Sequence, residues 1–231
     1  YHIVRSKRMK DAIHSINNQA YVEILPALGV DTEVFNPENK NENEKNKHDI
    51  VNILFVGRLS HVKGVKYLIE GFSQLMDKYK DIKLIIVGEG KLKNELKNIV
   101  RKMGLSNSVE FKGALPHLEL PDIYNESDIF VLPSLWEGLP NVILEAMASG
   151  LPVIATNVGN NEKLIEHFKG GYLIEPKDSN QICKYLEKLV KNPELRKEMG
   201  LYNWEVVRKY DQKIILDKRV RMLNEVYNNE L

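Results

Sequence analysis

Short apolar segments alternate with amphipathic segments over about residues 50–175, and this alternation limits the folds that the chain can adopt. The apolar segments, rich in aliphatic and β-branched residues, are Ile50–Gly57, Ile82–Gly90, Ser108–Gly113, Asp128–Ser134, Leu151–Thr156 and Gly170–Pro176. Helical patterns lie between them, at 65–79, 91–104, 118–127, 141–150 and 160–168. Short strands that alternate with helices are typical of a parallel sheet with helices on both faces. The pattern therefore predicts an α/β protein with a doubly wound, Rossmann-like sheet of six parallel strands.

The rest of the chain surrounds this sheet domain, which we expect to cover residues 50–200. Residues 1–37 contain one helical pattern, one strand pattern and a turn. Residues 38–49 contain no apolar residue and predict an exposed linker or loop. Residues 201–231 predict a long amphipathic helix with nothing evident to cover. Because the chain also begins with Tyr1 rather than Met, we expect it to be a piece of a longer protein.

Composition excludes several classes of protein. Hydrophobic residues make up 43% of the 231 residues, which is enough for a sizeable core. A net charge of +1 argues against a surface dedicated to nucleic acid. No apolar run approaches the ~20 residues of a membrane-spanning helix. With a single cysteine, Cys183, and no secretory signal, the sequence indicates a cytoplasmic protein.

Two cations follow the first predicted strand, where a doubly wound sheet binds its ligands. Arg58 and Lys63 lie just before a predicted helix, which Ser60 could cap. Two cations beside a helix N-terminus suit a diphosphate, because the backbone amides and the helix dipole also favour negative charge. Solvated surface cations would give the same pattern, so the spacing alone leaves both interpretations open. The segment is not a P-loop, because no Gly-Lys-Ser/Thr follows.

Two glutamates follow the fourth predicted strand. Glu137 lies in the predicted loop, and Glu145 lies on a helix that we expect to begin at Pro140 or Asn141. Ionised carboxylates accept hydrogen bonds from hydroxyls, so the pair could hold vicinal diols of two sugar rings joined by a diphosphate. Gly138 would allow the backbone to approach such a ligand closely. One helix charge and one unrelated loop charge remain the alternative interpretation.

Nicotinamide and metal sites are poorly supported. The segment after the second predicted strand, GEGKLKNEL, begins like a dinucleotide fingerprint, but Lys93 stands in place of the third glycine, which favours a tight turn. His61 and His117 fall in strand-end loops without the ligand spacing of a zinc site. The chain also contains no Asp-x-Asp motif. The sequence therefore favours neither a nicotinamide site nor a zinc site, and it lacks one common motif for a divalent ion on a nucleotide sugar.

Taken together, these segments resemble the C-terminal, donor-binding half of the retaining GT-B glycosyltransferases of family 4, also called glycosyl transferases group 1. The resemblance is carried by FVGRLSHVKGVKYLIEGF, LIIVGEG, VEFKGALP, DIFVLPSLWEGLPNVILEAMASGLPVIAT and GYLIEPKD, in this order. Glu137 and Glu145 fit the E-x7-E signature of that family. The match covers about residues 20–200 and is more specific than any of its single motifs.

The resemblance implies roles for individual residues. Arg58 and Lys63 would bind the donor diphosphate and stabilise the leaving group as charge develops. Glu145 would hold the ribose hydroxyls, and Glu137 would hold hydroxyls of the transferred sugar and count with the two cations as catalytic. The other donor-binding residues that it implies are Gly57, Leu115, Gly138, Leu139, Pro140, Asn141 and Val142, with Leu115 against the base.

The resemblance also implies an activity. Family members transfer a hexose from a nucleotide diphosphate sugar, of the UDP-sugar or GDP-mannose type, with retention of configuration and typically without a metal. The acceptor would be a glycan or a lipid-linked sugar, and the pathway would be surface polysaccharide biosynthesis. The parent protein would be cytoplasmic, or peripheral at the inner membrane face.

The family has two Rossmann-like domains, and only the second is complete here. Residues 1–37 would be a remnant of the first domain and the hinge, and residues 201–231 would be the helix that crosses back to it. Since the first domain would carry the acceptor site, we expect this chain to bind nucleotide but to transfer little or no sugar. The sequence departs from the family at two places. Leu28 replaces an asparagine in the hinge region, away from the donor, whereas Gly159-Asn160 replaces Gly-Gly in a loop near the donor, so the fine specificity does not follow from the resemblance.

Two other functions are compatible with a fold of this kind. A non-catalytic nucleotide-sugar-binding or partner subunit could keep the same fold, but such a protein would be expected to lose at least one of Arg58, Lys63, Glu137 and Glu145, and all four are present. A nicotinamide-dependent oxidoreductase is disfavoured by the incomplete glycine pattern and by the lack of an evident proton donor.

Overall fold

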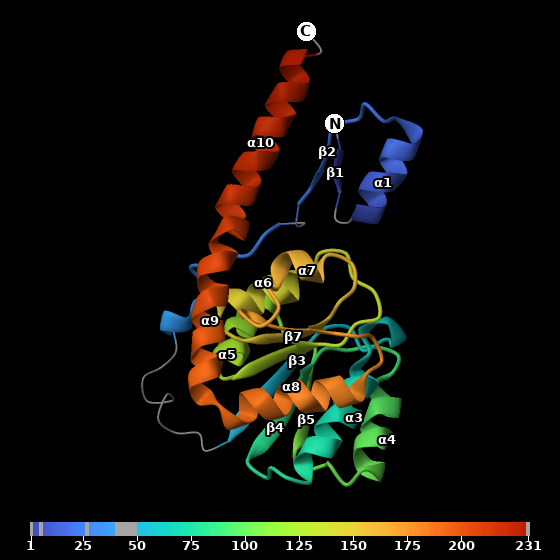
Figure 1. Cartoon of the computed structure of the whole chain (residues 1–231), viewed down its shortest axis with the longest axis vertical. Helices are drawn as coiled ribbons and strands as arrows, with labels where there is room; N and C mark the ends of the chain where they lie inside the picture. Colours follow the sequence, from blue (N-terminus) through green and yellow to red (C-terminus); the bar gives the residue numbers. More distant parts are fainter. Residues whose placement is uncertain (1, 5–6, 26–27, 40–49, 230–231) are drawn as a thin grey trace.

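Six parallel strands form the central sheet of the structure, a computed structural model that describes residues 2–4, 7–25, 28–39 and 50–229 (Figure 1). The strands are β3 (Val51–Val56), β4 (Ile82–Val87), β5 (Val109–Gly113), β6 (Ile129–Leu132), β7 (Val153–Thr156) and β8 (Gly171–Ile174). Each lies inside one of the six predicted segments, so the predicted doubly wound sheet is confirmed. The strand order is β5-β4-β3-β6-β7-β8, which places the topological switch point between β3 and β6.

Helices cover both faces of this sheet because the strands are apolar on both sides. Ile53, Leu54 and Phe55 of β3 are fully buried although their side chains alternate between the two faces. The helices are α3 (Val65–Met76), α4 (Lys93–Lys102), α5 (Leu120–Asn125), α6 (Asn141–Ala148), α7 (Asn161–Leu164), α8 (Ser179–Lys191) and α9 (Pro193–Val207). Helix α3 packs against α4 and α8 on one side, and α6 packs against α5 and α9 on the other (Figure 1).

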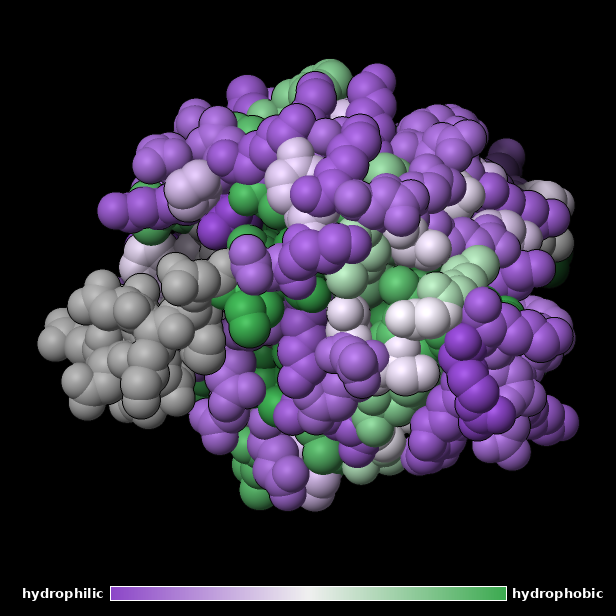
Figure 2. All heavy atoms as spheres, turned by 90° about the horizontal axis from the view of Figure 1, so that it is seen from below, coloured by the Kyte–Doolittle hydropathy of each residue, from purple (hydrophilic) through white to green (hydrophobic). Residues whose placement is uncertain are grey.

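The surface seen from the α3, α4 and α8 side is largely hydrophilic, with apolar side chains visible in patches between the polar ones (Figure 2). This agrees with the amphipathic pattern of these helices, whose apolar stripes face the sheet. On α3 the buried residues recur at helical spacing: Val65, Leu68, Ile69, Phe72 and Leu75.

Helix α6 ends where the sequence predicts, at a glycine. Gly150 adopts a left-handed conformation, with a φ of 69°. The N–H of Gly150 donates to the carbonyl of Met147, and the N–H of Leu151 donates to the carbonyl of Ala146, both at 3.0 Å. These two bonds form a Schellman motif, which satisfies the last carbonyls of the helix and turns the chain into β7.

The predicted helix at 160–168 is wrong in its second half, since α7 ends at Leu164. His167 instead forms a bridge with Gly171, and its Nδ1 accepts a hydrogen bond from the N–H of Leu173 at 2.9 Å. Phe168 follows with a φ of 71°, which a helix does not permit. The helical spacing of the apolar residues was overridden by these contacts with the edge strand.

The amino-terminal residues form a separate small layer. Strand β1 (His2–Val4) pairs in parallel with β2 (Val22–Ile24), and α1 (Lys7–Ile16) connects them. The helix and the second strand match the prediction, whereas β1 was missed because three residues are too few to show an alternating pattern. The predicted linker at 38–49 falls mainly on residues 40–49, which lie outside the described residues.

Helix α10 (Gln212–Asn229) extends from the sheet domain past β1 and β2 (Figure 1). Its start is fixed by Asp211, whose Oδ2 accepts a hydrogen bond from Oγ1 of Thr32 at 2.6 Å. Ile215 and Met222 pack with Leu25. A second stripe of α10 is exposed at spacings of four, three and four residues: Leu216, Val220, Leu223 and Tyr227. No helix in the described part of the chain has both the length and the apolar character that crossing a membrane requires.

Candidate functional site

Residues from the loops after β3 and β6 meet at the carboxyl end of the sheet. Nζ of Lys63 lies 2.5 Å from Oε1 of Glu137, so an ion pair joins the two loops across the switch point. The N–H of Leu135 also donates to the carbonyl of Val62 at 2.7 Å. The structure thus brings together one predicted cation and one predicted carboxylate that are 74 residues apart in the sequence.

Glu137 is held in a nearly buried position, with only 7% of its surface exposed. Its Oε1 accepts a second hydrogen bond, from Oγ of Ser134 at 2.6 Å. Ser134 is fixed in turn, since its carbonyl accepts a hydrogen bond from Oγ1 of Thr156 at 2.5 Å. Among the described residues, Oε2 of Glu137 has no hydrogen-bond partner. One oxygen is therefore used by the protein, while the other remains available as an acceptor.

The loop of Glu137 is braced from the loop after β7. Gly159 has a φ of 65°, and a Cβ built on it would lie 2.1 Å from the carbonyl oxygen of Glu137. The backbone N–H and the Nδ2 of Asn160 both donate to the carbonyl of Gly138 at 3.1 Å. Asn160, one of the departures from the family pattern, therefore supports the backbone that carries Glu137.

The second carboxylate, Glu145 on α6, is also only 7% exposed. Its Oε2 accepts a hydrogen bond from the hydroxyl of Tyr124 at 2.9 Å, and its Oε1 lies 3.4 Å from Nε2 of His117. Burial raises the pKa of the Glu145 carboxyl, while Tyr124 and His117 act in the opposite direction. Burial, reinforced by the neighbouring carboxylate, also raises the pKa of Tyr124 well above its ordinary value. Tyr124 therefore acts here as a hydrogen-bond donor.

An aromatic cluster surrounds these partners of Glu145. Phe35, from the segment before the sheet domain, is 1% exposed. Its ring makes edge contacts with the rings of His117, at 5.5 Å between centroids, and of Tyr124, at 5.7 Å. Sequence reasoning missed Phe35 and Tyr124 and considered His117 only as a metal ligand, because nothing in their spacing connects them with Glu145.

The N-terminus of α6 lies between the two glutamates in the sequence. Pro140 precedes the helix in an extended conformation, and no side chain caps the first turn. Leu139 and Pro140 are buried, whereas Gly138, Asn141 and Val142 are partly exposed. The free N–H groups and the positive end of the helix dipole make this turn suitable for a negatively charged or strongly polar ligand.

The loop after β3 differs in part from the prediction. Arg58 is exposed, and within the described residues its side chain makes no hydrogen bond or ion pair. The expected cap by Ser60 is wrong: Ser60 precedes a short 3-10 helix (His61–Lys63) and its side chain makes no capping bond. Gly64, with a φ of 63°, separates this turn from α3.

The glycines after β4 have a packing role. A Cβ on Gly88 would lie 1.9 Å from the carbonyl oxygen of Gly57, and one on Gly90 would lie 2.3 Å from that of Leu59. The N–H of Leu59 donates to the carbonyl of Glu89 at 2.9 Å. The loops after β3 and β4 are therefore in direct backbone contact, which accounts for these glycines without a dinucleotide.

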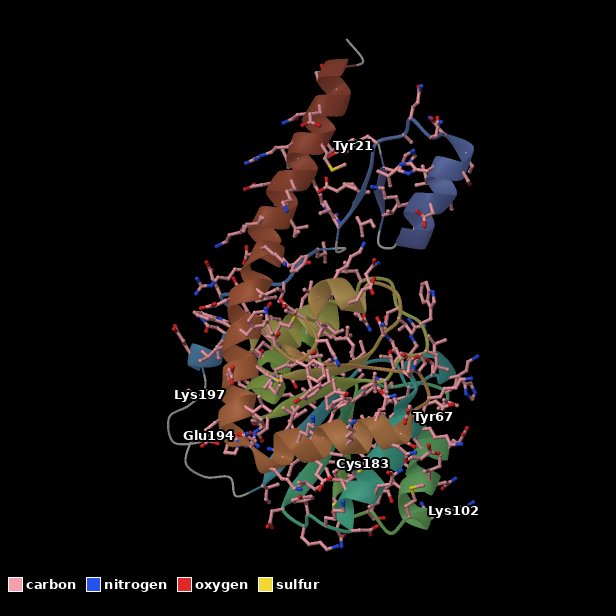
Figure 3. All side chains as sticks on the ribbon, in the orientation of Figure 1. Tyr21, Tyr67, Lys102, Cys183, Glu194 and Lys197 are labelled. Carbon is pink, nitrogen blue, oxygen red and sulfur yellow. The ribbon has the colours of Figure 1, made fainter. Side chains whose placement is uncertain are left out.

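Leu115 is the remaining predicted residue. It follows β5 at the same end of the sheet, is partly buried, and packs against the main hydrophobic core. The free Cys183 lies elsewhere, half-buried on α8 (Figure 3). Across the described ranges, no group of three or more His, Cys, Asp or Glu residues has the geometry to hold a metal ion.

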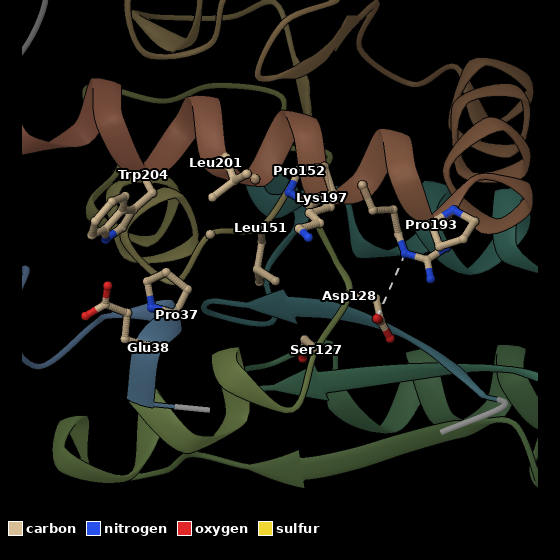
Figure 4. Close-up of a pocket in the computed structure, with 13 residues that line it drawn as sticks. Pro37, Glu38, Ser127, Asp128, Leu151, Pro152, Pro193, Lys197, Leu201 and Trp204 are labelled. Carbon is tan, nitrogen blue, oxygen red and sulfur yellow. Dashed lines mark ion pairs between the residues drawn. The ribbon is translucent and has the colours of Figure 1, made fainter. Parts of the chain in front are cut away.

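A cavity of about 440 Å³ lies at the opposite, amino end of the sheet (Figure 4). Asp128 and Pro152, which precede β6 and β7, line it together with Arg196, Lys197 and Trp204 of α9. Nε of Arg196 lies 3.9 Å from Oδ1 of Asp128. None of the predicted site residues lines this cavity, and ligands of doubly wound sheets bind at the carboxyl ends of the strands. We therefore assign the candidate site to the carboxyl end.

Comparison with known proteins identifies relatives of this chain. The family model described as "Glycosyl transferases group 1" matches residues 35–205. An uncharacterized glycosyltransferase of Haemophilus influenzae is 39% identical over 166 residues, which cover 71% of this chain and 45% of that protein. The UDP-Gal:alpha-D-GlcNAc-diphosphoundecaprenol alpha-1,3-galactosyltransferase of Escherichia coli is 35% identical over 178 residues, which cover 74% of this chain and 44% of that protein.

Solved structures agree with these matches. The C-terminal domain of a glycosyl transferase group 1 family protein from Francisella tularensis superposes with a TM-score of 0.71 at 34% identity, over 79% of this chain and 99% of that domain. The six-stranded parallel sheet and its helices match GT-B glycosyltransferase folds. The chain spans about half the length of the curated relatives it matches.

Proposed function

The chain belongs to the glycosyl transferases group 1 family, and we propose that it is the donor-binding part of a retaining glycosyltransferase of family 4. The observation that carries this proposal is the ion pair between Lys63 and Glu137, which joins the two loops that flank the switch point. Glu145 lies on the helix that follows the same loop, with its carboxylate already ordered by Tyr124.

The chemistry of these groups suits a nucleotide diphosphate sugar. Arg58 and Lys63 provide positive charge for the diphosphate and for the leaving group, and the uncapped N-terminus of α6 adds backbone donors. Glu145 would accept hydrogen bonds from ribose hydroxyls, and the unused oxygen of Glu137 would accept them from the transferred hexose. Leu115 would pack against the base. With two cations assigned to the diphosphate, we propose that the reaction proceeds without a metal or a cofactor.

The substrates are proposed by class. The name of the Escherichia coli relative gives a UDP-sugar donor and a diphosphoundecaprenol-linked acceptor. We propose a UDP-sugar or GDP-mannose type of donor and a glycan or lipid-linked acceptor for the parent of this chain, in surface polysaccharide biosynthesis. Such a protein would act in the cytoplasm, peripheral to the inner membrane face. A non-catalytic nucleotide-sugar-binding or partner subunit with the same fold is the alternative.

The acceptor site would belong to the part of the protein that precedes this chain. On this proposal residues 1–37 are a remnant of an N-terminal domain with the hinge, and residues 201–231 are the helix that crosses back to that domain. The exposed apolar stripe of α10 is consistent with such a role. The isolated chain is then expected to bind nucleotide while transferring little or no sugar.

Calorimetric titration of the chain with UDP, GDP, ADP and NAD, in the presence of a chelator, tests this proposal. We expect one nucleoside diphosphate to bind selectively, with Glu145→Ala weakening that binding about tenfold or more. Glu198→Ala, at an exposed position on α9, is the matched control and should bind as the unmodified chain does. Binding of NAD in preference to every diphosphate, or no binding at all, would contradict the proposal.

A further inference from the structure

Both oxygens of the Glu145 carboxylate face side chains of other elements. The hydroxyl of Tyr124, on α5, donates to Oε2 at 2.9 Å. Nε2 of His117, in the 3-10 helix His117–Glu119 after β5, lies 3.4 Å from Oε1. Among the described residues, these are the titratable groups in contact with Glu145. The carboxylate is therefore oriented by two elements other than the helix that carries it.

The ring of Phe35 packs against both partners, of which His117 is exposed and Tyr124 is buried. Phe35 contacts the edge of His117 and the edge of Tyr124, and it reaches them from the segment that follows β2. Tyr124 is completely buried, so its ring has little freedom to move. Its hydroxyl lies 3.3 Å from the carbonyl of Val142, which makes that contact longer than the one to Glu145.

We infer that Tyr124 and His117 are positioning residues for Glu145, and that Phe35 keeps both in place. The inference rests on the proposed function, because it concerns the carboxylate that would hold the ribose of the donor. It adds residues that neither the E-x7-E spacing nor the position on α6 indicates.

The charge of Glu145 determines how it can bind a ribose. Only the ionised carboxylate can accept hydrogen bonds from both hydroxyls of a ribose while donating none. Burial opposes ionisation, and it is the largest influence on this group. A hydrogen bond donated by Tyr124 stabilises the ionised form, and a second donor at His117 does the same. The remaining lone pairs are then held at fixed directions for the ligand, which lowers the ordering cost of binding.

Tyr124→Phe is the decisive variant, because it removes the hydroxyl and keeps the ring that packs on Phe35. Without ligand, the Glu145 carboxyl is followed by NMR against pH in protein labelled with ¹³C at glutamate. We expect its titration midpoint to move upward, since a donor to the charged form is lost. Tyr172→Phe is the control, because it removes the hydroxyl of another buried tyrosine, on β8. It should leave the midpoint unchanged.

Binding of UDP and GDP is then measured on the same proteins between about pH 5 and pH 8. Tyr124→Phe is expected to lower the affinity for the nucleotide that the unmodified chain prefers by about tenfold. As the pH is lowered, the variant should begin to lose affinity at a higher pH than the unmodified chain does. His117→Gln, which can still donate through its amide, should retain more affinity than His117→Ala. A purely structural role would not produce this rescue or move the pH profile.

The possible results distinguish the positioning role of Tyr124 from the proposed donor site. If the unmodified chain binds nucleotide but Tyr124→Phe leaves the Glu145 titration and the pH profile unchanged, the positioning role is wrong and the proposed function stands. If the titration moves as expected but no protein binds nucleotide, Tyr124 positions Glu145 and the donor-site assignment is wrong. Circular dichroism melts of each variant identify any loss that comes from unfolding alone.

Discussion

Nζ of Lys63 and Oε1 of Glu137 lie 2.5 Å apart, and Oγ of Ser134 donates to the same oxygen at 2.6 Å. The lysine is therefore partly neutralised before any ligand arrives, whereas Arg58 is exposed in the same loop. The two cations are therefore not equivalent. Lys63 would exchange or share its carboxylate partner when a diphosphate binds, whereas Arg58 can bind a diphosphate without giving up a partner. This difference leads to separate predictions for the two sides of the ion pair.

Glu137→Ala should discriminate between a nucleotide sugar and a free nucleotide. The variant loses the acceptor that we assign to the hexose, so affinity for a nucleotide sugar should fall about tenfold. Affinity for the free diphosphate should be retained or increase, because Lys63 loses its competing partner. Calorimetry with UDP and UDP-glucose, or with the GDP pair, measures both constants. Equal losses for the two ligands would show that Glu137 does not contact the sugar.

Lys63→Ala should lower the stability of the ligand-free protein. It leaves the carboxylate of Glu137, whose side chain is 9% exposed, without its cation and with one remaining donor. We expect the free energy of unfolding to fall by about 1–3 kcal/mol. Lys66→Ala is the matched control, because Lys66 makes an exposed ion pair with Glu70 on α3 and should change stability by less than about 0.5 kcal/mol. Urea denaturation of the two variants compares them, and similar losses would contradict a buried role for the pair.

Glu145→Gln should change stability in a way that depends on pH. The folded-state pKa of Glu145 is raised above its ordinary value of 4.5, chiefly by burial. The folded state thus favours the protonated group, and the stability that this gives is lost as the pH rises through the folded-state pKa. The uncharged glutamine does not titrate, so its stability relative to the unmodified protein should improve as the pH rises above about 4.5, the ordinary pKa of the group.

At neutral pH we expect Glu145→Gln to be more stable than the unmodified chain by about 0.5–2 kcal/mol, the range common for single stabilising substitutions. Thermal melts across this pH range give the comparison, with Glu198→Gln on the exposed side of α9 as the control. A stability difference that stays constant with pH would be inconsistent with a raised pKa at Glu145.

Gly64→Ala should be strongly destabilising. A Cβ there would lie 2.0 Å from the carbonyl oxygen of Pro133, and the residue has a φ of 63°. Gly104 provides the comparison, because its φ is 71° and no atom lies within 4 Å of its Cβ position. Gly104→Ala should cost about 1 kcal/mol from the left-handed backbone alone. Gly64→Ala should cost more than about 3 kcal/mol and release the ion pair between Lys63 and Glu137. Chemical denaturation distinguishes the two, and equal losses would mean that the loop shifts freely.

The sheet could be predicted from the sequence because its information is local. Each strand is a short apolar run next to an amphipathic helix: the buried residues of β3 are consecutive, and those of α3 recur at helical spacing. The loops that carry Glu137 and Lys63 could be placed at one end of the sheet for the same reason, since parallel strands share their carboxyl ends.

The parts that could not be predicted depend on contacts between distant residues. No sequence pattern relates Tyr124 and Phe35 to Glu145. Tyr124 contacts Glu145 from another helix, and Phe35 contacts Tyr124 from the segment that follows β2. Ser60 has the right residue type for a cap, but its side chain makes no capping hydrogen bond with the 3-10 turn that follows it. Strand β1 is stabilised by its partner β2 rather than by its own three residues.

The close approach of Gly88 to Gly57, and of Gly90 to Leu59, restricts how this protein can vary. Since no side chain fits between the two loops, a change of backbone shape in one loop requires a matching change in the other. Single substitutions that change the backbone of the loop that carries Arg58 are therefore expected to be poorly tolerated. New donor specificity is more accessible to substitutions in the loop after β5, where the Cβ position of Gly113 meets only a side-chain oxygen, that of Glu89 at 3.2 Å.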